Sequence, residues 1–203
     1  MKLTRATPKA IEYACKNFHY SKSIPTVQYA YNVYNNKEEW CGVILFGGGA
    51  NNNLAKSCNL HNGEVLELER VALNGKQEMT SKAVSIALRL LRKDDPIVKM
   101  VVSYADHRQN HLGIIYQATN WLYLGISKTT DTQYYYKGKW THERTINSKS
   151  NRDYLKKILP KRQNANKFKY IYVYDDKLKE EYKKIAKPYP KKEDLTSKDA
   201  PLV

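Results

Sequence analysis

The sequence predicts an α/β domain in which helices flank a mixed, partly antiparallel sheet. Residues 27–34 alternate apolar and polar side chains, and a polar turn separates them from an apolar run at 40–46, which predicts a hairpin. The β-branched run at 98–102 predicts a buried strand, and the helical spacing of apolar residues at 80–91 predicts a crossover helix. Hairpins join antiparallel strands and crossover helices join parallel ones, so both strand senses are expected in a single domain of 203 residues.

The elements are expected in a fixed order along the chain. A helix over 8–17 opens with Thr7 as N-cap and Pro8 in its first turn. The hairpin and a third alternating strand at 64–73 follow, and Thr80 or Ser81 caps the helix that runs through Leu91. The remaining expectations are a strand at 97–104, a helix at 110–118, strands at 122–126 and 169–174, and a helix at 178–187.

The composition changes after residue 150. Residues 150–203 carry fifteen Lys and Arg against eight Asp and Glu. We expect a main domain over 1–150, a basic extension over 151–187 that completes the sheet, and a disordered tail over 188–203.

The whole chain is strongly basic, with a formal net charge of +15 and a pI near 9.6. Such a charge favours a polyanionic partner, because phosphate binding releases counterions; a solubilising surface is the alternative. Three scattered cysteines predict reduced thiols, neither a disulfide framework nor a CxxC zinc site. No apolar run approaches 18 residues, so we expect a cytoplasmic protein without a membrane contact.

Two segments carry candidate chemistry. Asp106, His107 and His111 follow the buried strand, where a carboxylate and an imidazole could form a general base or part of a metal site. The alternative for Asp106 is to cap the following helix. The segment YYYKGKW at 134–140 offers aromatic groups that could stack on or wedge between bases, or it forms an edge hairpin protected by lysines.

The element order resembles the GNAT (N-acetyltransferase-like) fold. In that fold a strand–loop–helix unit holds the pyrophosphate of acetyl-CoA at the helix N-terminus, which here implies Thr80 and Ser81. Of the usual Gln/Arg-x-x-Gly-x-Gly/Ala loop only Gly75 is present. Arg70 is a candidate for phosphate contact, or pairs with a neighbouring Glu. Tyr116 resembles the tyrosine that faces the acyl-CoA sulfur, or is a core aromatic.

A narrower resemblance spans about residues 15–130. It rests on FHYSKSIP, GVILFG, LERVA, SYAD and GIIYQATNW, in that order, and these are similar to the Mom family of phage proteins that modify adenine in DNA. The resemblance implies a phage or prophage enzyme that adds a carbamoylmethyl-type group to N6 of adenine and so protects DNA from restriction. The implied partner is double-stranded DNA, whose target base would be flipped out of the duplex. The oligomeric state stays open, with a homodimer as one option.

The resemblance also implies a site. His19, Tyr20, Asp106 and Tyr116 are its catalytic candidates, and Arg70, Thr80, Ser81 and Tyr116 its coenzyme candidates. A carbamoylmethyl group is attached through its methylene carbon, which ordinary acyl transfer does not achieve, so iron held by His19, Tyr20 and Asp106 is a further candidate. Two alternatives remain: an acetyltransferase for a small-molecule or protein amine, and a non-catalytic DNA-binding phage protein.

Overall fold

The computed structural model describes residues 1–49, 53–106, 111–127, 131–163 and 166–195. The chain forms two compact units that interleave along the sequence. The large unit comprises Met1–Tyr104, Gly113–Gly125 and Lys169–Tyr189, and the small unit comprises Ala105–Leu112, Ile126–Phe168 and Pro190–Val203. No described helix is both long and apolar enough to cross a membrane.

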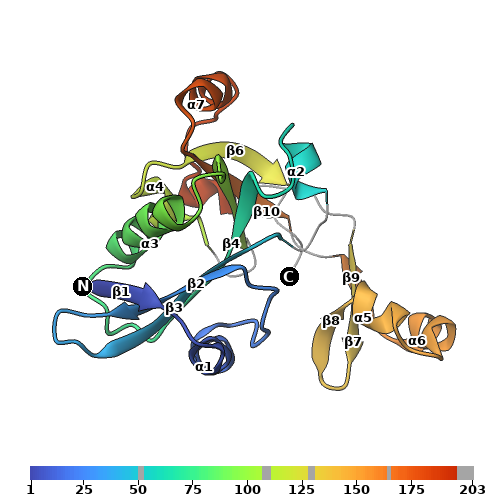
Figure 1. Cartoon of the computed structure of the whole chain (residues 1–203). Helices are drawn as coiled ribbons and strands as arrows, with labels where there is room; N and C mark the ends of the chain where they lie inside the picture. The colour runs from blue at the N-terminus through green and yellow to red at the C-terminus, as the bar shows by residue number, and fades with distance from the viewer. Residues whose placement is uncertain (50–52, 107–110, 128–130, 164–165, 196–203) are drawn as a thin grey trace. The chain divides into compact units, whose positions relative to one another are not determined.

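A seven-stranded mixed sheet with the order β1-β2-β3-β4-β5-β10-β6 organises the fold (Figure 1). Its strands are β1 (Lys2–Arg5), β2 (Tyr29–Tyr34), β3 (Trp40–Gly47), β4 (Val65–Leu73), β5 (Met100–Asp106), β6 (Leu122–Ser127) and β10 (Lys167–Val173). The first four strands pair antiparallel, and β4 pairs parallel with β5 after the crossover helix α3 (Thr80–Asp94). The expected mixed α/β architecture is therefore confirmed.

Helices cover both faces of the sheet. Helix α1 (Pro8–Phe18) packs its buried Cys15 against Val43 and Leu45 of β3. Because alternate residues of a strand point to opposite faces, Tyr31 of β2 lies on the other side, where its hydroxyl donates to Asp94 of α3 at 2.7 Å. Thr7 caps α1 by accepting from Ala10 N, as expected from the sequence.

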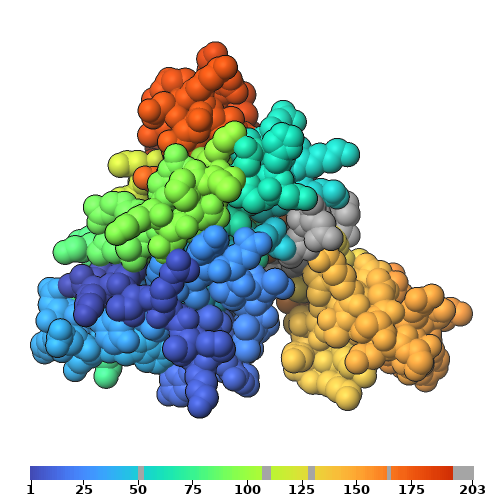
Figure 2. Space-filling view, in the orientation of Figure 1, coloured from blue at the N-terminus to red at the C-terminus, as the bar shows by residue number. Residues whose placement is uncertain are grey.

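The far half of the sheet has its own core. Val65, Met100, Val102 and Ile171 are buried there with α2 (Leu54–Ser57). Helix α7 (Asp176–Lys183) contributes partly buried side chains and buries no residue completely, which matches its projecting position at the surface (Figure 2).

The small unit holds a three-stranded antiparallel sheet with the order β8-β7-β9. Its elements are β7 (Thr132–Tyr136), β8 (Lys139–His142), β9 (Lys161–Gln163), α5 (Glu143–Asn147) and α6 (Arg152–Ile158). Strands β7 and β8 form a hairpin whose two turn residues, Lys137 and Gly138, have positive φ, the pattern of a tight primed turn. YYYKGKW thus forms the hairpin that the sequence left as one alternative.

Several boundaries differ from those expected. The fifth strand begins at Met100 instead of 97, and the helix expected over 110–118 is the short α4 (Ile114–Gln117). In the expected tail, the Tyr189 hydroxyl donates to the Trp121 carbonyl at 2.7 Å and Lys192–Leu195 form a 3-10 helix; residues 196–203 lie outside the described residues.

Candidate functional site

The parallel pairing of β4 with β5 is short. Val65–Glu67 pair with Met100–Val102, and within the described part of the chain no pairing of these strands continues beyond them, although β4 extends to Leu73. At the next position of β5, a side-chain hydrogen bond replaces the backbone pairing: Ser103 Oγ donates to the Leu68 carbonyl of β4 at 3.0 Å. The polar group of Ser103 therefore sits where the two strands separate.

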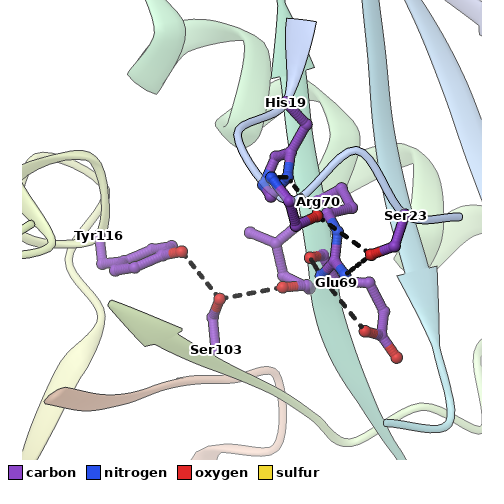
Figure 3. A network of polar contacts seen from close by, with 8 residues as sticks. His19, Ser23, Glu69, Arg70, Ser103 and Tyr116 are labelled. Carbon is purple, nitrogen blue, oxygen red and sulfur yellow. Dashed lines mark hydrogen bonds and ion pairs between the residues drawn. The ribbon is translucent and has the colours of Figure 1, made fainter. Parts of the chain in front are cut away.

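Ser103 connects this point to Tyr116 of α4 (Figure 3). Its Oγ lies 2.8 Å from the Tyr116 hydroxyl. A serine hydroxyl has one proton, so Ser103 can donate a hydrogen bond to either the Leu68 carbonyl or the Tyr116 hydroxyl, but not to both at once. While it donates to Leu68, the Tyr116 hydroxyl donates to Ser103; if Tyr116 loses its proton, Ser103 can turn and donate to the phenolate.

Aromatic packing fixes the position of the Tyr116 ring. Its centroid lies 5.0 Å from that of Trp121 and 5.1 Å from that of Tyr170. Gly113 precedes α4 with a φ of 73°, and a Cβ there would lie 2.4 Å from the Tyr170 ring. Burial raises the pKa of Tyr116 to about 12, so the phenol keeps its proton at neutral pH.

Arg70 of β4 connects the sheet to the loop that follows α1. Its guanidinium donates from Nη2 to Ser23 Oγ at 3.3 Å and from Nη1 to the Glu69 carbonyl, with the Glu69 carboxylate 3.9 Å away. The Arg70 Nε is buried and has no hydrogen-bond partner among the described residues. The Glu69 pairing that the sequence left as an alternative is thus present, and the buried Nε–H remains available as a donor.

The loop after α1 carries His19 and Tyr20. The His19 Nδ1 lies 2.8 Å from Ser21 Oγ, which is 3.1 Å from Ser23 Oγ, so a chain of hydroxyls joins the imidazole to Arg70 (Figure 3). The rings of His19 and Tyr20 lie 4.4 Å apart, and Tyr20 is 51% exposed. The structure therefore brings together His19, Tyr20, Arg70 and Tyr116 of the predicted residues in the large unit.

Thr80 and Ser81 begin α3, but neither caps it. The N-cap is Met79, which makes no side-chain hydrogen bond to the helix, so the expected cap was wrong. Thr80 is instead the first residue of the helix, and its Oγ1 accepts a hydrogen bond from Gln77 Nε2 at 2.9 Å. The first turn of α3 contains no acidic residue.

Asp106 is the last residue of β5 and belongs to the small unit. The expected alternative that it caps the next helix was wrong, because Gly113 is the N-cap of α4. His111 N donates to the Asp106 carbonyl at 3.3 Å, and His107 lies outside the described residues. The described residues contain no group of three or more His, Cys, Asp or Glu side chains that could hold a metal ion. A role of Asp106 beside His19 stays a prediction.

Sequence reasoning missed Ser103 and Ser23 as members of the polar network. A signal for Ser103 existed, since it is the one hydroxyl within the buried run Met100–Ala105 apart from the partly exposed Tyr104. No local pattern distinguishes Ser23, which is placed only by its contact with Arg70 across 47 residues.

Comparison with known proteins identifies the fold and the family of this chain. An acetyltransferase from Bacillus subtilis, solved in complex with CoA, has the same fold, with a TM-score of 0.50 over 86% of this chain and 97% of that chain at 11% identity. The protein is therefore of the GNAT-like acetyltransferase fold. The Mom protein family model matches residues 2–191, and the chain belongs to this family. The methylcarbamoylase mom of Escherichia phage Mu is 31% identical over 134 residues, which are 64% of this chain and 55% of the Mu protein. The match thus spans about half the length of that relative.

Proposed function

We propose that this protein is a phage DNA-modifying transferase that adds a carbamoylmethyl-type group to N6 of adenine and thereby protects DNA from restriction endonucleases. The observation that carries the proposal is the family match over nearly the whole chain, joined to a relative that bears the name methylcarbamoylase. The net charge of +15 supports a polyanionic substrate.

A CoA-type ligand fits the N-terminus of α3. The helix start has neither a side-chain cap nor a carboxylate, so its first N–H groups are suited to phosphate oxygens. Gly75 in the preceding loop has a φ of 86° and no atom within 4 Å of an added Cβ, which leaves its backbone open to close approach. Thr80, Ser81 and Arg70 would hold the phosphates. A bound acyl-CoA would supply an acyl unit whose carbonyl carbon is activated by the thiolate leaving group. Attack at that carbon alone would give an N6-acyl product, so the methylene linkage needs a further co-reactant and no step of the proposed reaction is derived through CoA.

Tyr116 is suited to donate a proton, and Ser103 is suited to stabilise the phenolate that this donation leaves. The phenol is protonated at neutral pH and lies beside the separation of β4 from β5. It can donate to a departing anion, while Ser103 turns from Leu68 and stabilises the phenolate that remains.

His19 and Tyr20 are proposed to line the acceptor side of the same site. Their loop is tied to Arg70 through Ser21 and Ser23, so the imidazole is held by the sheet instead of moving with an unsupported loop. The formation of an N6–carbon bond releases a proton from the adenine amine, and His19 and Asp106 are the candidates to accept it.

The iron hypothesis rests on the sequence and on the methylene linkage, not on a ligand cluster among the described residues. No step is derived through it. Metal analysis of anaerobically purified protein beside a His19→Ala variant tests it directly: iron in the parent that is lost in the variant supports the hypothesis, and negligible iron in both removes it.

The proposal is tested by nucleoside mass spectrometry of DNA from cells that express the chain. We expect a mass-shifted deoxyadenosine that disappears in Asp106→Ala, together with resistance of the DNA to restriction. Turnover of acetyl-CoA on small amines without modified DNA would instead indicate an acetyltransferase. DNA binding without either product would indicate a non-catalytic protein.

A further inference from the structure

The small unit concentrates the positive charge of the chain. Residues 126–168 contain eleven Lys and Arg but only three Asp and Glu. Each of these acids already has a basic partner within the unit: Asp131 with His142, Glu143 with Lys156, and Asp153 with Arg152. The segment therefore carries a net positive charge that its own acids do not balance, and such a charge favours a polyanionic partner.

The two faces of the β8-β7-β9 sheet differ in what covers them. Tyr134 is buried against Ile146 of α5 and Leu155 of α6, and Tyr136 packs against the same cluster. Because side chains alternate along a strand, Tyr135 points to the opposite face. Its direct cross-strand partner is Trp140 of β8, and these two side chains are 43% and 37% exposed.

On the exposed face of this sheet, contacts among the side chains hold them in position. The Arg162 guanidinium lies over the Trp140 ring at 4.2 Å from its centroid, and its Nε donates to Gln133 Oε1 at 3.0 Å. The Tyr135 and Trp140 rings meet edge to face at 5.4 Å. Gln133 is the cross-strand partner of Arg162, so all four side chains lie on one face of the sheet. We call these four residues the aromatic face.

We propose that the aromatic face binds DNA by stacking an unpaired base, while the surrounding lysines contact the phosphates. Aromatic rings and guanidinium planes stack on bases without sequence preference, and basic side chains hold the backbone beside them. Lys137 is exposed in the turn of the β7-β8 hairpin. Lys139 and Lys161 are exposed on the two outer strands, where their cross-strand partners Tyr136 and Tyr134 place them on the opposite face, so they would reach the phosphates from the edges of the sheet. Apolar side chains that enter an opened base step are a common way to hold distorted duplexes.

This inference rests on the proposed function only in taking DNA as the substrate. Extrusion of a target adenine leaves unstacked bases, and extrusion is easiest where pairing is already lost. The aromatic face would then favour a duplex that presents an unpaired base over a fully paired duplex of the same length and charge. The aromatic rings would determine the preference for an unpaired base, whereas the lysines would determine the salt dependence of DNA binding.

The test compares binding of the full chain to two short labelled duplexes, one fully paired and one with adenine opposite an abasic site, over a series of salt concentrations. We expect tighter binding to the second duplex, and Trp140→Ala to weaken that binding by about 5- to 100-fold without changing the salt slope. The matched control is Tyr154→Ala, which removes a 62% exposed aromatic from α6 of the same unit and should bind like the parent. Lys137→Gln, in the exposed turn beside this face, should lower the salt slope by about one.

A second variant tests the proposal even if Trp140→Ala fails to fold. Trp140→Phe keeps a ring in β8, and it should bind DNA yet lose the quenching of tryptophan fluorescence that stacking causes in the parent. Equal affinity of parent and Trp140→Ala for the abasic duplex, or unchanged quenching in Trp140→Phe, overturns the proposal. The assays contain no group donor, so their outcome is independent of adenine modification: a chain that modifies no DNA can still pass them, and a modifying enzyme can fail them.

Discussion

Replacement of Tyr116 by Phe separates the packing role of this ring from its role in proton transfer. The substitution keeps the contacts of the ring with Trp121 and Tyr170 and removes only the hydroxyl. Ser103 retains the Leu68 carbonyl as an acceptor, so no buried donor is left without a partner. The structure therefore predicts a small effect on folding and a large one on turnover.

The magnitudes follow from the contacts. Loss of one 2.8 Å hydrogen bond between neutral hydroxyls costs about 1 kcal/mol of unfolding free energy. That corresponds to a decrease in Tm of about 2–4 °C for a chain of this size. If Tyr116 is the proton donor, the rate of adenine modification falls by about 100- to 10,000-fold.

Two measurements decide the outcome. Thermal unfolding followed by circular dichroism reports the stability, and the fraction of modified deoxyadenosine after a fixed expression time reports the turnover. A Tyr116→Phe variant that is stable and modifies DNA at the parent rate would refute the proton-donor role. A variant that loses more than about 3 kcal/mol would refute the assignment of the hydrogen bonds, because that exceeds the usual cost of one bond.

Three further predictions concern the same site. Ser103→Ala should cost about 1–3 kcal/mol in urea unfolding, more than Tyr116→Phe, because it leaves the buried Leu68 carbonyl unpaired; an equal or smaller loss would contradict this. Gly113→Ala should displace the Tyr170 ring and lower Tm below that of Ser103→Ala, since its φ of 73° is strained for Ala and its Cβ would lie 2.4 Å from that ring; an unchanged Tm would contradict it. Stability should be complete below pH 10 and fall as the pH rises toward 12, because the unfolded chain releases the Tyr116 proton first, at a cost of about 3 kcal/mol for this group; in Tyr116→Phe the decline should be shallower, and an identical slope would count against it.

The large unit could be predicted from sequence where the local pattern and the tertiary environment agree. Alternation over 64–73 and helical spacing over 80–91 led to β4 and α3 within a few residues of their observed bounds. The N-terminal β1 was missed because four residues with one strongly apolar side chain carry no periodic signal, and its pairing partner lies about thirty residues away. The small unit was missed as a separate body because its strands are three to five residues long.

The candidate site was less accessible to sequence reasoning. His19, Arg70 and Tyr116 came from resemblance, and their connections through Ser23 and Ser103 depend on contacts across 13 to 47 residues that no local spacing encodes. The α3 N-terminus shows the opposite case. Capping preferences favour Thr80 as the N-cap, yet Met79 occupies that position and no side chain caps the first turn of the helix.

The central proposal is that this protein attaches a carbon substituent to N6 of adenine through a methylene group. Tandem mass spectrometry of deoxyadenosine from DNA of expressing cells tests it most directly, with Tyr116→Phe as the matched control. The account predicts a nucleoside whose fragments carry a carbamoylmethyl group on N6, strongly diminished in the variant. Unmodified deoxyadenosine from cells that contain the folded protein, or a substituent joined to N6 through a carbonyl carbon, would contradict it.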